Sequence, residues 1–90
     1  MAEIIQRAFA GTMESSDVYV EIEPGDGEIQ LELESVVRRQ FGQDIQAAVR
    51  EVLAQWGVEN ANVSVRDRGA LDCVIRARVE TAVRRGRGNN

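Results

Sequence analysis

The sequence predicts an α+β domain, in which a small antiparallel sheet of about four strands packs against one long helix and a C-terminal helix. Two observations lead to this fold class. Apolar and polar residues alternate with a period of two in residues 17–23 and 28–34, which is typical of strands with one wet face. From Ser35 onward the apolar spacing changes to three and four residues, which is typical of an amphipathic helix.

The first strands are expected in the N-terminal third of the chain. The alternating runs 17–23 and 28–34 flank Pro24-Gly25-Asp26-Gly27, whose residue types are common in turns. We therefore expect these two runs to form a β-hairpin. Residues 6–13 are less regular, and we expect them to add a further strand beside the hairpin.

The long helix is expected over residues 36–56, because the apolar residues of this segment form one stripe. Glycine inside a helix costs about 1 kcal/mol, so Gly42 favours a separate first turn and a firm helix that begins near Gln43. Gly57 is a natural stop. Phe41 and Trp56 lie on the stripe, and we expect both in the core.

The last third of the chain is expected to hold one strand and one helix. Residues 58–65 predict a turn and a short strand with Val63 and Val65 inward, closed by Gly69. Residues 70–85 fit both periods, but their length, and Asp72 near the start with arginines at the end, favour a helix. We expect residues 1–85 to form a single domain and residues 86–90 a flexible basic tail.

Composition excludes several classes of function. The 90-residue chain has no histidine and a single cysteine, which argues against a metal site and against Cys-His or Ser-His catalysis. We expect Cys73 to pack in the core as a small hydrophobic residue. A net charge of −4 argues against nucleic acid as a partner. Neither a membrane span nor a secretory signal is visible, so a cytoplasmic location is expected.

Two segments of the chain resemble a known family. Residues 10–18 read AGTMESSDV, residues 67–80 read DRGALDCVIRARVE, and residues 39–42 (RQFG) fit between them. In this order and at this length, they resemble the acyl carrier protein (gamma) subunit of citrate lyase. The resemblance implies a non-catalytic carrier domain over residues 1–85, with no catalytic residue of its own.

The resemblance also implies an attachment site. In that family a serine of the first motif carries 2'-(5''-phosphoribosyl)-3'-dephospho-CoA through a phosphodiester, and by position this serine is Ser15. The family commonly reads E-S-G-D, whereas Ser16 stands here in place of the glycine. Ser16 is therefore the second choice for attachment. The residues themselves predict an exposed turn over 14–17, in which the serines and Asp17 bond to local backbone amides.

The implied partners are the citrate lyase alpha and beta subunits and a prosthetic-group transferase, with citrate cleaved to acetate and oxaloacetate. Glu14 and Asp17 are candidates for recognition by a basic patch on these partners. Arg76, Arg78 and Asp72 belong either to a docking surface or to a solvated helix face. Two alternatives stay open for the whole chain: the carrier subunit of malonate decarboxylase, and a small α+β interaction module without a prosthetic group.

Overall fold

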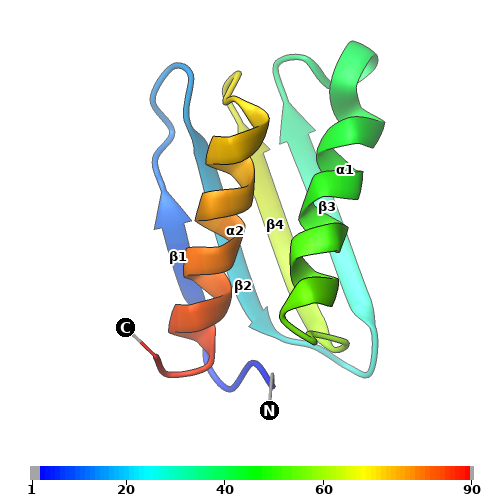
Figure 1. The fold of residues 1–90 in the computed structure, drawn as a ribbon, viewed down its shortest axis with the longest axis vertical. Coiled ribbons are helices and arrows are strands. Elements are labelled where there is room, and N and C mark those ends of the chain that lie inside the picture. Colours follow the sequence, from blue (N-terminus) through cyan, green and yellow to red (C-terminus); the bar gives the residue numbers. More distant parts are fainter. Residues whose placement is uncertain (1–2, 90) are drawn as a thin grey trace.

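The structure, a computed structural model that describes residues 3–89, is a four-stranded sheet with two helices on one face (Figure 1). The fold class, the number of strands and the two helices agree with the sequence prediction. Neither helix within residues 3–89 is long and apolar enough to cross a membrane. The elements are, in chain order, β1 (Ala8–Gly11), β2 (Val18–Pro24), β3 (Ile29–Ser35), α1 (Arg38–Gln55), β4 (Ala61–Asp67) and α2 (Asp72–Gly86).

The strand order β1-β2-β4-β3 corrects the predicted hairpin. Strands β1 and β2 are antiparallel neighbours, as expected, and β2 also pairs antiparallel with β4. Strand β3, however, pairs parallel with β4, so the sheet is mixed and β2 does not touch β3. The physical reason is that α1 serves as the crossover of a β3-α1-β4 unit, which places β4 between the two strands expected to form the hairpin.

The core lies between the sheet and the two helices. Alternate residues of every strand face the helices, and these are aliphatic almost without exception. Val63 and Val65 are inward, as the sequence predicts. The largest fully buried apolar side chains are Val18, Val20, Ile22, Val49, Leu53, Val65, Val79 and Val83.

Helix α1 differs from its prediction at its start. It runs without a break from Arg38 through Gly42, and Gly42 is buried in it. A Cβ at Gly42 would lie 3.1 Å from the Arg38 side chain, so the lack of a side chain suits this position. Phe41 was expected in the core but is 49% exposed, because the first turns of α1 extend past the end of the sheet (Figure 1). Trp56 is half-buried and packs against the core.

Helix α2 confirms the choice of helix over strand for the last segment. It ends at Gly86, one residue later than predicted, with Asp72 in its first turn. Gly86, which was assigned to the tail, is buried, and its carbonyl accepts hydrogen bonds from the amides of Ile5 (2.9 Å) and Gln6 (3.2 Å). Residues 87–89 follow the helix, and Asn90 lies outside the described residues.

Candidate functional site

Three loops meet at the end of the sheet that is opposite the two termini (Figure 1). They are the β1–β2 loop (residues 12–17), the β3–α1 loop (36–37) and the β4–α2 loop (68–71). The first of these contains both candidate serines. We refer to the three together as the loop end.

Ser15 lies on a β-turn that presents it to solvent. The Asp17 amide donates to the Glu14 carbonyl (3.1 Å), which closes the turn over residues 14–17, and both serines are exposed. Ser16 has a φ of 67°, in the left-handed region that favours glycine. A positive φ at the third position is typical of a type II turn. The exposed turn is therefore as predicted, and position 16 has the backbone that the family's glycine would supply.

The Asp17 carboxylate organises this loop from within. It accepts hydrogen bonds from the Thr12 hydroxyl (2.6 Å) and from the Val18 amide (2.7 Å). The Arg78 guanidinium of α2 lies 3.1 Å from the same carboxylate. These hydrogen bonds, the Thr12 one above all, hold the pKa of Asp17 below its usual range. Asp17 is only 16% exposed and its carboxylate is engaged within the loop, whereas Glu14 is exposed.

The backbone fixes the two stems of the loop. The Ser16 amide donates to the Arg68 carbonyl (2.8 Å), and the Arg68 amide donates to the Asp17 carbonyl (2.9 Å). At Gly11 the φ is 91°, and a Cβ there would lie 1.8 Å from the Val18 carbonyl oxygen. Only glycine fits this close approach of β1 to β2.

A buried aspartate joins the other two loops. Asp67 is 2% exposed, and it accepts hydrogen bonds from the Ser35 hydroxyl (2.8 Å) and the Ala70 amide (2.9 Å). Its own carbonyl accepts from the Val36 amide (3.2 Å). Sequence reasoning missed Asp67 and the Arg78–Asp17 pair, because contacts between residues 32 and 61 positions apart leave no local pattern.

The remaining arginine candidate, Arg76, forms ion pairs within the chain. Arg76 lies 2.6 Å from Asp72 and 3.0 Å from Glu51, on the outward side of the helices. Asp72 and Glu51 hold the pKa of Arg76 above its usual value. Exposed ion pairs of this kind add little to stability, and they fit the solvated helix face that the sequence left open.

Cys73 is exposed, which corrects its predicted place in the core. On α2 the inward stripe contains Ile75, Val79 and Val83. Cys73 is two positions before Ile75, about 200° around the helix, and so it points away from the sheet. The prediction rested on the residue type alone, and it did not take account of the position of Cys73 outside the inward stripe of the helix.

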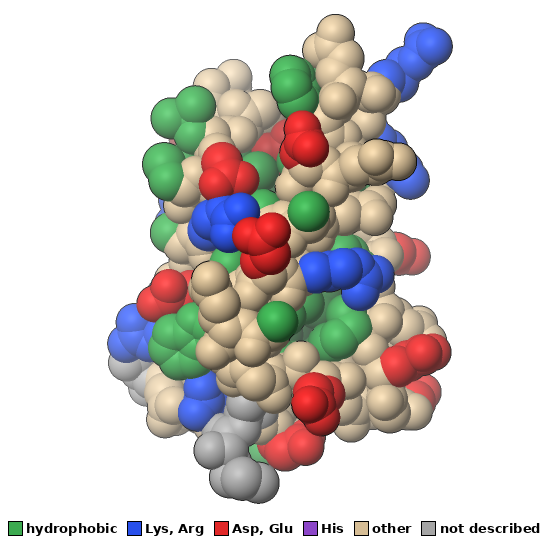
Figure 2. All heavy atoms as spheres, turned by 45° about the vertical axis from the view of Figure 1, so that its right-hand side comes forward, with side chains coloured by type: hydrophobic (Ala, Val, Ile, Leu, Met, Phe, Trp, Pro, Cys, Tyr) green, Lys and Arg blue, Asp and Glu red, His purple; other side chains and the backbone are tan. Residues whose placement is uncertain are grey.

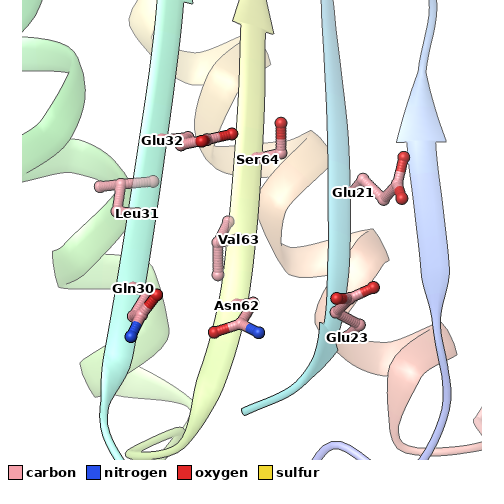
Figure 3. A pocket seen from close by; sticks show the side chains of 8 residues that line it. All are labelled: Glu21, Glu23, Gln30, Leu31, Glu32, Asn62, Val63 and Ser64. Carbon is pink, nitrogen blue, oxygen red and sulfur yellow. The ribbon is translucent and has the colours of Figure 1, made fainter. Parts of the chain in front are cut away.

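The open face of the sheet carries a shallow hollow of about 340 Å³. Figure 3 shows its polar side chains, which come from β2, β3 and β4 and include the carboxylates of Glu21, Glu23 and Glu32. Glu21 is paired with Arg7, whose guanidinium lowers its pKa. None of the lining residues belongs to the loop end, so the hollow is separate from the serines.

The loop end presents the Ser15 hydroxyl at the surface. Within residues 3–89 no hydrogen bond engages the hydroxyl of Ser15, and no group of three or more acidic or cysteine side chains is placed to hold a metal ion. The nearby Asp17 carboxylate is turned toward Thr12, Val18 and Arg78. The Ser15 hydroxyl is therefore accessible from solvent.

Comparison with known proteins identifies the family to which the chain is similar. Residues 5–86 match a family of acyl carrier proteins described as malonate decarboxylase delta subunit. The chain is 58% identical over 84 residues to the citrate lyase acyl carrier protein of Escherichia fergusonii, covering 92% of this chain and 87% of that one. It is 53% identical over 83 residues to the Haemophilus influenzae protein of the same name, covering 92% and 86%.

A solved structure shows the same fold. The chain superposes on part of a Pseudomonas malonate decarboxylase hetero-tetramer in complex with malonate with a TM-score of 0.77, at 21% identity, covering 93% of this chain and 87% of that chain. At this identity the likeness concerns the fold alone. The identities of 53–58% over most of both chains decide the family, and this chain belongs to the citrate lyase acyl carrier proteins.

Proposed function

We propose that this chain is the acyl carrier subunit of a citrate lyase complex and carries acetyl and citryl groups on a phosphoribosyl-dephospho-CoA arm attached to Ser15. The observation that supports it is the exposure of Ser15 on a turn whose neighbours are all fixed by hydrogen bonds. Ser16 is the second choice, and its left-handed backbone, which glycine favours, supports the alignment of Ser16 with the glycine of the motif.

The residues around Ser15 fit such a group. The turn projects from the end of the sheet, and Glu14, Ser15 and Ser16 are exposed, so an arm has room to leave the surface. When bound, the arm supplies a thiol for thioester chemistry. The chain has no histidine, and no carboxylate of the described residues bonds the Ser15 hydroxyl. Removal of its proton during attachment therefore falls to the transferase.

In this proposal the catalytic residues belong to the other subunits, and this chain contributes none. The alpha and beta subunits of the complex cleave citrate to acetate and oxaloacetate, while the carrier supplies anchor, reach and docking. Ser15 is an anchor and takes no part in turnover. We place the carrier in the cytoplasm with these subunits, where a free and exposed thiol such as Cys73 is kept reduced.

The second candidate is the carrier subunit of malonate decarboxylase. The description of the matching family model favours it. The identities of 53–58% to proteins named for citrate lyase favour the first proposal. Incubating the loaded carrier with the catalytic subunits of each enzyme separates the two, since only the cognate subunits should restore cleavage of citrate or decarboxylation of malonate.

An intact mass of the chain purified from its native host tests the proposal. A nucleotide-sized addition is expected on the wild-type chain, lost in Ser15→Ala and retained in Ser16→Ala. Cys73→Ser should also keep the addition and accept acyl groups, because the loaded sulfur belongs to the arm. An addition that survives in Ser15→Ala and disappears in Ser16→Ala would move the site by one residue. A wild-type chain without any addition in cells that cleave citrate would favour the interaction module.

A further inference from the structure

Beyond the attachment site itself, we propose that the loop end is the docking surface for the transferase that modifies Ser15. The surface is formed by the exposed apolar side chains of Met13, Val36 and Leu71, one from each of the three loops around the serine. The inference rests on the proposed function, because it takes Ser15 as the acceptor.

The three loops form one platform. Arg68 is joined through its backbone to Ser16 and Asp17 of the β1–β2 loop, and Asp67 is joined to Ser35 and Val36. A Cβ built on Gly69 would lie 4.0 Å from the Val36 side chain, so the β3–α1 and β4–α2 loops are in near contact. A partner therefore meets a preformed surface and orders little on binding.

Apolar exposure is concentrated on this platform. Met13 is 40% exposed, Val36 61% and Leu71 70%. Six large apolar side chains of residues 3–89 are exposed, and these three loops of only twelve residues hold three of them. In the space-filling view, hydrophobic side chains reach the surface at the upper end of the molecule among scattered charges (Figure 2). Isolated exposed apolar residues need no explanation, but three on the connected loops beside the candidate serine do.

The chemistry at Ser15 indicates which partner binds the loop end. An enzyme that forms a bond to the Ser15 oxygen must bring its active site within bonding distance, and a specific interface covers about 800 Å² per partner. Such a footprint centred on residue 15 covers the loop end. Because the β1–β2 and β4–α2 loops offer one exposed acid, Glu14, and one arginine, Arg68, the contact is expected to be mainly apolar. The matching partner surface is an apolar rim around the transferase active site.

Initial rates of attachment provide the test. Unmodified carrier is mixed with the transferase and its activated donor, and the mass increase is followed at several carrier concentrations. Leu71→Ser and Val36→Ser should each raise the KM for the carrier by about tenfold and leave kcat nearly unchanged, since they remove binding and not chemistry. Leu71 is the N-cap of α2, where serine is favoured, so the fold is retained.

Ile5→Ser is the matched control, because Ile5 is 66% exposed and lies near the opposite end, beside Gly86. Its KM should equal that of the wild type. An unchanged KM in both loop-end variants, or an equal rise in Ile5→Ser, would overturn the surface while the proposed function stands. A wild-type chain that gains no mass would overturn the proposed function and the surface together.

Discussion

The two connections at the ends of β2 resemble each other in sequence but are built differently. The β1–β2 loop (12–17) joins antiparallel neighbours, whereas residues 25–28 must pass the start of β4 to reach β3. Both are short, and both contain acidic residues near glycine. Only the first contains the candidate attachment site.

The difference lies in what holds each connection. In the β1–β2 loop the side chains of Asp17, Thr12 and Arg78 form the centre. In residues 25–28 the backbone approaches β4 directly: the Gly27 amide donates to the Asn60 side chain (2.7 Å), and a Cβ at Gly25 would lie 2.8 Å from the Ala61 amide.

The two connections show how a small domain presents one residue at its surface. The Asp17 carboxylate holds the β1–β2 loop from its inner side, so the side chains on the outer side are not needed to hold it. Ser15 therefore stands on a rigid base with an available hydroxyl. The second connection also has an exposed residue, Asp26, but the contacts that hold it come from its own backbone against Asn60 and Ala61. Each of the following substitutions changes one of the two connections and has its control in the other or beside it.

The largest effect is expected for Gly11→Ala. The new Cβ would meet the Val18 carbonyl oxygen at 1.8 Å with φ at 91°, so the first connection must rearrange. We expect a loss of about 3 kcal/mol or more in the free energy of unfolding. At the other end of β2, Gly27→Ala has a φ of 112° but nothing within 4 Å of the Cβ, so only conformational strain of about 1–2 kcal/mol applies. Denaturant unfolding of both variants gives the comparison, and equal losses would contradict it.

An intermediate effect is expected for Asp17→Asn. The pKa of Asp17 is lowered in the folded state, so its carboxylate stabilises the fold above the unfolded pKa of about 3.9 and loses that contribution as the pH falls through the folded value. At pH 7 the variant should be about 1–2 kcal/mol less stable, a range that allows for solvent screening of the half-exposed Arg78. The difference from wild type should shrink below about pH 4.

The control for Asp17→Asn is Asp26→Asn in the second connection. Asp26 is exposed, so its substitution should change the stability by less than about 0.5 kcal/mol at pH 7. Urea titrations of the three proteins at pH 7 and pH 3 provide the measurement. A difference between wild type and Asp17→Asn that persists unchanged at pH 3 would show that the carboxylate charge is not the cause.

The sequence predicts which side chains of a strand face the core better than it predicts which strands pair with each other. Alternation identifies the inward side chains of residues 18–22 and, in the later strand, Val63 and Val65, because burial on one face of a strand has a period of two. The same alternation says nothing about which strand pairs with which. Pro24-Gly25-Asp26-Gly27 has turn chemistry, and it does turn the chain, but the insertion of β4 is decided by the β3-α1-β4 unit.

The candidate site, too, could be predicted only in part. The exposed turn at Ser15 could be predicted, since polar turn residues lie between two strand-like runs. Two hydrogen bonds of the site could not be predicted: the one from Arg78 to Asp17 and the one from Ser35 to Asp67. Each joins segments that only the completed fold brings together. Two residues were wrongly predicted in the core. Cys73 was placed there because of its residue type, but it lies outside the inward stripe of α2, and Phe41 lies on a turn of α1 that extends past the end of the sheet.

The smallest effect, and the one with an unusual sign, is expected for Ser16→Gly. Ser16 holds a left-handed φ of 67°, which costs an L-residue about 1–2 kcal/mol, while glycine loses roughly 0.5–1 kcal/mol more in backbone entropy on folding. The balance predicts a gain of about 0.5–1 kcal/mol. Ser15→Gly, one residue earlier and without a positive φ, should instead lose up to about 1 kcal/mol. Thermal and urea unfolding of the two variants give opposite signs if the turn is as described, and a loss of stability in Ser16→Gly would contradict the type II turn that places the Ser15 hydroxyl outward.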